Sequence, residues 1–166
     1  MDICYKNAGG KFNFRAAALI IKNGKLLIHR LKTDSFYALP GGRVTLMEDT
    51  EAAILRELKE ELNVKAKVKS LLWISENFFE LYSEKFHEIG FYYLVECDDK
   101  NLNIDIDCFD VNEDGKILEF KWVKLEELKD IEFYPIFIKD RIFDLPTTIE
   151  KVVDINDKMN LDLYRR

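Results

Sequence analysis

Acidic side chains concentrate in one short stretch, residues 48–61, with the spacing of helical turns. Glu57, Glu60 and Glu61 stand at positions i, i+3 and i+4, so a helix would place their carboxylates on one face. Like charges at this spacing destabilise a helix by roughly a few tenths of a kcal/mol per pair. A divalent cation would remove that repulsion, and carboxylate oxygens favour Mg²⁺ or Mn²⁺ over Zn²⁺. The stretch therefore predicts a site for a hard metal ion.

Residues around these three glutamates support the same interpretation. Arg56 offers a planar fork that can orient a neighbouring carboxylate. Glu48 stands near the expected helix start, where the macrodipole favours a negative charge. Gly41, in the turn Pro40-Gly41-Gly42, allows the backbone to approach a metal or phosphate closely. The alternative is a solvated acidic helix face that binds no metal.

A helix over about residues 49–62 must position these side chains. Asp49 or Thr50 can cap its start, and leucines at 55, 58 and 62 share the side opposite the glutamates. Asn63 stands where the helix would end, because asparagine tolerates the left-handed conformation nearly as well as glycine. The helix is therefore amphipathic, with an apolar side for a core and an acidic side for chemistry.

Several stretches around this helix have the composition of strands. The pair Asn23-Gly24 between two apolar runs is a strong hairpin signal. Strands are expected over residues 12–22, 25–30, 64–73, 88–96 and 117–125, with short helices from 126 and over 135–143. Strands and helices alternate without a strict parallel period. This order predicts an α/β fold with a mixed β-sheet and helices on its faces.

The overall charge excludes some classes of protein. The chain has 166 residues and a formal net charge of −6, which argues against a protein that binds bulk nucleic acid. Residues 1–41 carry seven Lys/Arg and two Asp/Glu, whereas residues 96–119 carry nine acids and two bases. Nothing in 96–119 has ligand spacing, so this stretch is interpreted as a solvated loop or short edge strand. A small phosphorylated ligand is compatible with the acidic balance if a bound cation reverses the local charge.

Cysteines and hydropathy point to a cytoplasmic location. The three cysteines form no CxxC pair, which favours a reducing compartment. No apolar run approaches the roughly 18 residues of a membrane span, so no membrane partner is expected. The first residues lack the layout of a signal peptide.

The spacing from Gly42 to Val64 resembles the Nudix box of the Nudix hydrolase superfamily. Five residues separate Gly42 from Glu48, and seven more precede Arg56-Glu57-Leu58-Lys59-Glu60-Glu61. The family has Gly where this chain has Asn63, the single departure among nine defined positions. Further stretches between about residues 10 and 145 also look like blocks of bacterial members of the superfamily.

The resemblance implies a fold, an activity and partners. The fold would be a Nudix-like α/β/α sandwich over residues 1–145, with 146–166 as a C-terminal extension of the same domain. The activity would be Mg²⁺- or Mn²⁺-dependent hydrolysis of a pyrophosphate bond in a nucleoside diphosphate derivative: a nucleotide sugar, nucleoside triphosphate or dinucleoside polyphosphate. The partner would be a small phosphorylated nucleotide, and a homodimer is left open.

The resemblance also assigns roles to individual residues. Glu57, Glu60 and Glu61 would bind metal, with the Gly41 carbonyl and Glu48 as further or auxiliary ligands. Arg56 would hold a glutamate in place. The general base would be Glu61, Glu60 or Glu88, in that order of preference. Candidate substrate-binding residues are cations, aromatic rings that can stack a base or ribose, and one histidine: Arg15, Arg30, Phe36, Tyr37, Phe78, Phe79 and His87.

Alternatives remain at this point. The chain has no Pro between Gly41 and Tyr134, so it departs from an ADP-ribose-specific pattern. Tyr82 lies near where diadenosine-polyphosphate hydrolases often have a tyrosine. The rivals to an enzyme are a catalytically silent nucleotide sensor or regulator on the same fold and a glutamate-rich structural domain without metal.

Overall fold

A computed structural model describes residues 1–98, 102 and 104–156 of the chain. The strands are β1 Cys4–Asn7, β2 Gly10–Leu19, β3 Ile21–Lys22, β4 Lys25–Leu31, β5 Tyr37–Ala38, β6 Gly41–Arg43, β7 Ala66–Leu81, β8 Glu84–Cys97, β9 Cys108–Glu113, β10 Lys116–Lys124, β11 Phe133–Tyr134 and β12 Glu150–Ile155. The helices are α1 Thr50–Leu62, the 3₁₀ helix η1 Leu125–Asp130, and α2 Phe137–Arg141.

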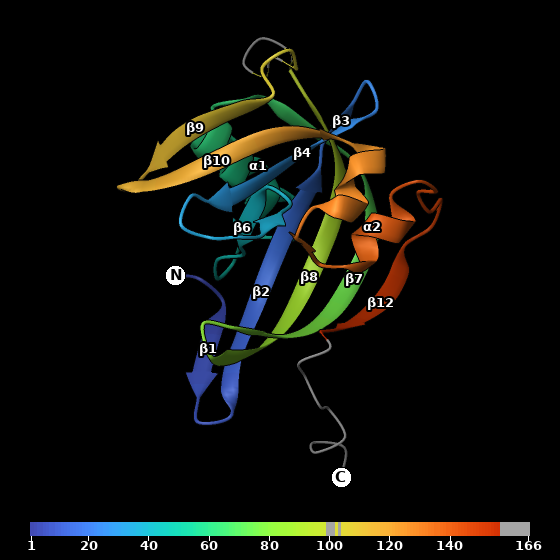
Figure 1. Cartoon of the computed structure of the whole chain (residues 1–166). Coiled ribbons are helices and arrows are strands. Elements are labelled where there is room, and N and C mark those ends of the chain that lie inside the picture. Colours follow the sequence, from blue (N-terminus) through green and yellow to red (C-terminus); the bar gives the residue numbers. More distant parts are fainter. Residues whose placement is uncertain (99–101, 103, 157–166) are drawn as a thin grey trace.

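The strands form two sheets (Figure 1). The first has the order β1-β2-β8-β7-β12, with β6 beside β2, and the second has the order β11-β5-β4-β10-β9, with β3 beside β4. β2 runs parallel to β8 and β12 runs parallel to β7, whereas β7 and β8 form a long antiparallel hairpin. The expectation of an α/β fold with mixed sheets is therefore confirmed.

The central helix begins and ends at the predicted residues. Asp49 caps α1 by accepting a hydrogen bond from the Ala52 N–H, at 2.8 Å. Asn63 has a φ of 51° and a ψ of 36°, the left-handed conformation, and its N–H donates to the Lys59 carbonyl. The buried residues of α1 are Ala53, Ile54, Leu58 and Leu62 together with Glu61. The expectation that all three glutamates lie opposite the apolar side was therefore wrong for Glu61.

Turn chemistry explains the hairpin between β3 and β4. Asn23 and Gly24 both have positive φ, at 48° and 73°, as a two-residue hairpin turn requires. The strand expected over residues 64–73 is the first half of β7, and the strand expected over 88–96 is the second part of β8. The expectation of an edge strand within 96–119 corresponds to β9.

Two apolar clusters cover the two faces of the first sheet. One contains Ala16 and Ala18 of β2 with the apolar side of α1 and with Leu27 of β4. The other contains Ala17 and Leu19 of β2 with residues of η1 and α2, including Leu128 and Ile138. Fully burying one such leucine contributes about 1.5–3 kcal/mol. The sheet is thus held between α1 on one side and η1 and α2 on the other (Figure 1).

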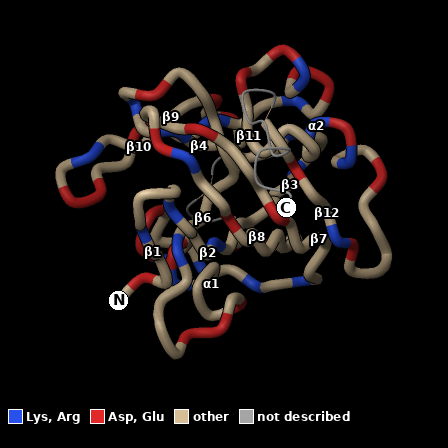
Figure 2. Tube along the Cα trace, turned by 90° about the horizontal axis from the view of Figure 1, so that it is seen from below, with Lys and Arg blue, Asp and Glu red and all other residues tan. Residues whose placement is uncertain are grey.

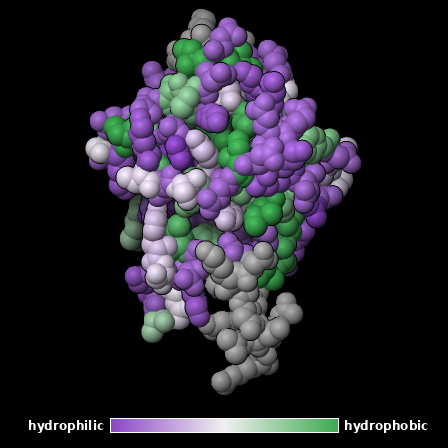
Figure 3. Space-filling model, in the orientation of Figure 1, coloured by the Kyte–Doolittle hydropathy of each residue, from purple (hydrophilic) through white to green (hydrophobic). Residues whose placement is uncertain are grey.

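The C-terminal stretch adds a strand to the same sheet. β12 pairs with β7 from Trp73 to Phe78, and Val152 packs into the cluster below η1 and α2. Residues 157–166 of the extension lie outside the described part of the chain. Hydrophilic residues dominate the face seen in Figure 3, with apolar residues in separate groups. No helix within the described ranges has the length and hydropathy needed to cross a membrane.

Candidate active site

Arg56 binds three of the four box glutamates. Its Nε and Nη2 donate to the two carboxylate oxygens of Glu48, at 2.8 and 3.0 Å. Its Nη1 donates to Glu57 at 2.7 Å and to Glu60 at 3.0 Å. Its Nη2 also donates to the carbonyl of Arg43 at 3.1 Å. A guanidinium has five N–H donors in a fixed plane, so these bonds use its whole donor set.

Glu48 is held from two sides. Besides Arg56, its Oε2 accepts hydrogen bonds from the backbone N–H and the hydroxyl of Thr45, at 3.0 and 2.9 Å. These bonds, and chiefly those from Arg56, lower the pKa of Glu48 to about 2. Glu48 is therefore ionised at neutral pH, and its position anchors Arg56 at the start of α1.

Gly42 makes room for the Glu57 carboxylate. A Cβ on Gly42 would lie 2.3 Å from Glu57 Oε2, which is a severe steric clash between non-bonded atoms. Burial raises the pKa of Glu57, although the hydrogen bond from Arg56 opposes that shift. The glycine of the Pro40-Gly41-Gly42 turn thus lets a carboxylate rest directly on the backbone of β6.

Glu61 lies apart from the arginine and is almost fully buried. Only 5% of the residue is exposed, the Gly41 N–H donates to its carboxylate, and its Oε2 has no hydrogen-bond partner among the described residues. Burial first, and the negative charges of Glu57 and Glu113 next, raise its pKa to about 8, although Arg15 opposes the shift.

His29 faces Glu61 but does not neutralise it. Its Nδ1 lies 3.8 Å from Glu61 Oε1 and lacks a hydrogen-bond partner within the described structure. Burial, and then the charge of Arg15, lower the pKa of His29 to about 3. The imidazole is therefore neutral at pH 7, and this contact is not an ion pair.

Glu113 at the end of β9 completes the cluster. One carboxylate oxygen from each of Glu57, Glu61 and Glu113 lies within 4.8 Å of the others. The sequence analysis found no ligand spacing in residues 96–119 and did not single out Glu113, whereas the structure brings its carboxylate to those of Glu57 and Glu61. Glu113 precedes the turn Asp114-Gly115 and is about fifty residues from the helix, so helical spacing gives no signal for it. Only the pairing of β9 with β10 brings it to α1.

The three carboxylates suit a hard divalent cation. Mg²⁺ takes oxygen ligands at about 2.0–2.1 Å in octahedral geometry, so oxygens around one ion lie about 3–4 Å apart. A spread of 4.8 Å is close to that range, and the unpartnered oxygen of Glu61 has no other described group to bind. Glu60, whose side chain is 53% exposed, stands outside this set and binds Arg56.

Gly41 lies behind the cluster. Its φ is 139°, and an added Cβ would lie 2.3 Å from the carbonyl oxygen of Ala16, so only glycine fits this turn. Its N–H faces Glu61. The sequence prediction that its carbonyl binds metal stays a prediction.

Arg15 is the predicted substrate-binding cation nearest to the cluster. Its Nη2 donates to the Leu39 carbonyl at 3.0 Å. Its positive charge opposes the rise that burial causes in the pKa of both Glu57 and Glu61. A bound phosphate at the carboxylates would therefore lie near a guanidinium. Figure 2 shows basic and acidic stretches side by side around β1, β6 and α1.

Arg30, Tyr37 and Phe36 form a second group on β4 and β5. The Arg30 guanidinium lies 4.7 Å from the centre of the Tyr37 ring, and both donate to Glu119, at 2.9 and 2.5 Å. The Phe36 ring packs edge-on against Tyr134, with 5.6 Å between centroids. Tyr82, at the tip of the β7–β8 hairpin, donates to Asp34 in the loop just before Phe36.

The remaining predicted substrate residues are divided between the two faces of the sheet. Phe78 pairs with His87 and stacks on it at 4.4 Å, whereas Phe79 stacks on Phe86 at 4.9 Å. Side chains alternate along a strand, so the Phe78–His87 pair lies on the face opposite to Arg15. Among the described residues, no hydrogen bond or ring contact joins this pair to Glu57, Glu61 or Glu113.

Glu88 is buried away from the other glutamates. Its two oxygens accept hydrogen bonds from the amides of Asn13 and Asn77, at 2.6 and 3.1 Å, and 7% of the residue is exposed. It lies on the same face of the sheet as Arg15 but is not a member of the carboxylate cluster.

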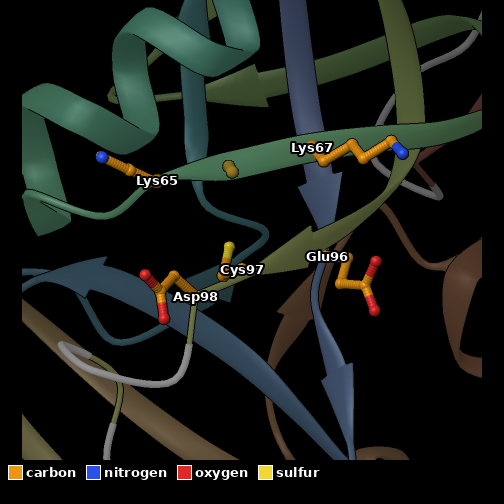
Figure 4. Close-up of a pocket in the computed structure, with 6 residues that line it drawn as sticks. Lys65, Lys67, Glu96, Cys97 and Asp98 are labelled. Carbon is orange, nitrogen blue, oxygen red and sulfur yellow. The ribbon is translucent and has the colours of Figure 1, made fainter.

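A separate pocket of about 460 Å³ lies at the start of β7 and the end of β8 (Figure 4). Its lining is a mixture of two lysines, two acids, Ala66 and Cys97. It contains none of the carboxylates described above. The pocket therefore has no part in the candidate site.

The two sheets, α1 and the carboxylate cluster together define a two-sheet α/β domain with an acidic site, and comparison gives its family. The family model described as NUDIX domain matches residues 12–141, most of the chain. The chain belongs to this family.

Individual relatives agree with that assignment. A 59-residue segment is 44% identical to an ADP-ribose pyrophosphatase from Methanocaldococcus jannaschii, and this match covers 34% of the chain and 35% of that protein. The chain thus matches about a third of the length of this curated relative.

Solved structures share the fold. A UDP-X diphosphatase has a TM-score of 0.58 and 19% identity, covering 88% of this chain and 69% of that one. A MutT protein from Methanosarcina mazei Go1 has a TM-score of 0.53 and 24% identity, covering 78% and 88%. At these identities the likeness concerns the fold alone.

Proposed function

We propose that the protein is a divalent-metal-dependent pyrophosphohydrolase that cleaves a nucleoside diphosphate joined to another group. The observation that carries this proposal is the convergence of Glu57, Glu61 and Glu113 at one point beside Arg15. Phosphoryl transfer depends mainly on positioning and on neutralising charge, and this arrangement offers both.

Each residue of the site has a defined task in this proposal. Glu57, Glu61 and Glu113 would hold Mg²⁺ or Mn²⁺, which would supply positive charge against the diphosphate and acidify a water molecule. Arg56 fixes Glu57 and keeps Glu48 and Glu60 in register around it. Arg15 contacts the phosphate. Gly41 and Gly42 let the two ligands of α1 lie against the backbone of β6.

Glu61 is the preferred group to accept a proton from the attacking water, with Glu60 as the alternative. Glu61 has a carboxylate oxygen without a hydrogen-bond partner among the described residues, whereas Glu60 and Glu48 each accept a hydrogen bond from Arg56.

The relatives support a sugar-bearing substrate. The curated relative is an ADP-ribose pyrophosphatase, and one structural neighbour is a UDP-X diphosphatase. We infer that the substrate is a nucleoside diphosphate linked to a sugar. The absence of Pro from the stretch after the box, where the ADP-ribose pattern has one, argues for testing several nucleotides.

The test is a panel of nucleoside diphosphate sugars, nucleoside triphosphates and dinucleoside polyphosphates, assayed with Mg²⁺ or Mn²⁺ and with chelator. Glu61→Gln should lower kcat by about 10²–10³-fold, as loss of a group at the reacting centre does. Glu51→Gln is the matched control, since Glu51 is an exposed acid in the first turn of the same helix. Nucleotide binding without turnover under either metal would instead support the sensor alternative.

A further inference from the structure

A buried polar network lies on the first sheet, on the same face as Arg15. Glu88 of β8 accepts from Asn13 of β2 on one side and from Asn77 of β7 on the other. Asn77 also donates to the hydroxyl of Tyr92, at 3.0 Å. These residues are 1–7% exposed, so the network is nearly removed from water. Asn13, Glu88 and Asn77 occupy adjacent register positions, and Tyr92 lies four residues further along β8. Such a group of polar side chains is unusual for the centre of a sheet.

The orientation of both asparagines is fixed by their other partners. Arg43 Nε donates to Asn13 Oδ1 at 2.7 Å, so the Asn13 amide nitrogen must face Glu88. Asn77 directs its amide nitrogen to both Glu88 and Tyr92. Glu88 is thereby held by neutral donors on both oxygens, and the Arg43 carbonyl in turn accepts from Arg56.

The network has unused acceptor capacity. Each oxygen of a carboxylate has about two acceptor positions, and each oxygen of Glu88 receives one hydrogen bond. Asn77 Oδ1 is buried and finds no donor in the described structure. Among the described residues no cation forms an ion pair with Glu88. A buried carboxylate with one hydrogen bond on each oxygen and a buried amide oxygen with none are both incompletely satisfied, and each favours a ligand that supplies O–H or N–H groups.

The position of the network relates it to the reacting centre. In the register of β2, Asn13 lies beside Glu88 and Arg15 lies beside Gly90. Asn13 and Arg15 are two residues apart, so their side chains project from the same face about 7 Å apart. Arg15 acts electrostatically on Glu57 and Glu61 at one end and on Tyr92 of the network at the other. A group attached to a phosphate held by Arg15 therefore extends along this face.

We propose that Glu88, positioned by Asn13 and Asn77, is the specificity-determining residue that accepts hydrogen bonds from the hydroxyl groups of a sugar ring attached to the diphosphate. This inference rests on the proposed pyrophosphohydrolase function and names the part of the substrate that the sheet selects. A further phosphate in this position would be repelled by Glu88, so a sugar is favoured over the terminal phosphate of a triphosphate. Glu88 then acts in recognition and not as the general base.

Two sugars of such a substrate have the required hydroxyls. One is the ribose of the nucleoside, and the other is the sugar on the far phosphate. A 2′,3′-dideoxynucleoside version of the substrate removes the first, and an ethyl ester of the nucleoside diphosphate removes the second. If Glu88→Gln no longer changes kcat/KM for one of these analogues, the sugar that this analogue lacks is the one that Glu88 binds.

The experiment compares kcat/KM for ADP-ribose with kcat/KM for these two analogues, in wild type and in Glu88→Gln. We expect wild type to prefer ADP-ribose to one analogue by about 10- to 100-fold, the range of a hydrogen bond to a charged group. Glu88→Gln should reduce that preference at least about tenfold. Asn77→Ala, which leaves the carboxylate in place but unpositioned, should reduce it less.

Controls separate recognition from folding and from chemistry. Glu96→Gln removes an exposed carboxylate of the same strand, which pairs with Lys69 at 3.2 Å, and should leave the preference unchanged. Thermal unfolding and circular dichroism check that each variant is folded. The pH profile of kcat should keep its shape in Glu88→Gln, since a recognition residue does not transfer the proton.

The outcomes are distinct. An unchanged preference in folded Glu88→Gln overturns the inference, as does an equal fall in kcat for all three substrates, which would mark Glu88 as a base. If wild type cleaves none of them, the proposed function fails. Calorimetry with a methylene-bridged ADP-ribose analogue then decides the inference by itself: a wild-type affinity at least about tenfold above that of Glu88→Gln supports it, and equal affinities overturn it.

Discussion

The glutamates of the site fall into two groups that the protein treats in opposite ways. Glu48, Glu57 and Glu60 each accept a hydrogen bond from Arg56, so their charges are compensated within the chain. Glu61 is more deeply buried, has an unpartnered oxygen and faces a neutral histidine. Glu57 belongs to both groups, because it also lies in the cluster with Glu61 and Glu113.

The difference separates framework from function. Each arginine-bound carboxylate has a cationic partner within the protein, and Glu48, whose pKa is lowered, fixes the geometry of Arg56. The charge of Glu61 is compensated poorly until a cation arrives. In the proposed metal site, binding of a cation would therefore relieve a cost that folding imposes on the Glu61 carboxylate.

Removing Arg56, which holds Glu48, Glu57 and Glu60 in place, should have the largest effect on stability. Arg56→Met leaves Glu48 and Glu57 partly buried without their donor, and we expect a loss of about 3–5 kcal/mol in the free energy of unfolding. Urea denaturation at pH 7 measures it. Lys59→Met is the control, since Lys59 is an exposed cation on the same helix. A loss in Arg56→Met no larger than in the control would contradict the framework role.

Removing the uncompensated charge should do the reverse. In metal-free protein at pH 8, Glu61→Gln should raise the free energy of unfolding by about 2–4 kcal/mol, because the pKa of Glu61 is raised from 4.5 to about 8. A raised acid pKa means that the folded state holds a proton that the unfolded state has lost. Wild-type stability should therefore fall as pH rises from about 4.5 to about 8.

Thermal or urea unfolding across this pH range, with and without Mg²⁺, tests that sign. Added metal should remove the decline in wild type and have little effect on Glu61→Gln. If the variant is less stable than wild type at pH 8 without metal, the assignment of an uncompensated charge is wrong.

Acid titration should affect the framework in the opposite direction. The pKa of Glu48 is lowered to about 2, so its contribution is complete above about pH 4.5 and is lost as pH falls toward 2. We expect Glu48→Gln to lower the free energy of unfolding by about 1–3 kcal/mol at pH 7, with the two proteins converging at the acid limit. Parallel stability curves down to pH 2 would refute this origin of the effect.

The smallest effect is expected at the edge of the cluster. Glu113 is half-buried on β9, and Glu113→Gln should weaken Mg²⁺ or Mn²⁺ binding about tenfold, or about 1.4 kcal/mol, with little change in metal-free stability. Calorimetry of metal binding measures it, with Asp110→Asn on the same strand as the control. Equal metal affinity in wild type and Glu113→Gln would remove Glu113 from the ligand set.

Local signals predicted the helix of the site, and long-range packing supplied the rest. Asp49 and Asn63 define the ends of α1 through hydrogen bonds within a few residues, which sequence displays directly. The box spacing likewise predicts Arg56 among its glutamates. Glu113 and the Asn13–Glu88–Asn77 network depend on strand order and register, which join residues 11 to 75 positions apart. No periodicity within one element records such pairings.

Assigning roles by residue type was less informative than assigning positions. Phe78 was expected to stack with a substrate and His87 to contact one, and the structure stacks these two rings on each other, on the face opposite to Arg15. Their substrate roles stay predictions. Successive residues of a strand point to opposite faces of the sheet, so a shift of one residue decides which face a side chain lies on. The sequence alone does not say which alternate residues of a strand face the site.

The C-terminal strand has a consequence for the behaviour of the protein in concentrated solution. β12 covers β7 from Trp73 to Phe78, the part of a long strand that would otherwise end the sheet. Unpaired hydrogen-bonding groups on an apolar edge recruit strands of other molecules and lead to aggregates. A chain cut before Glu150 should therefore precipitate more readily even where the carboxylate cluster is intact, and these last paired residues protect colloidal stability.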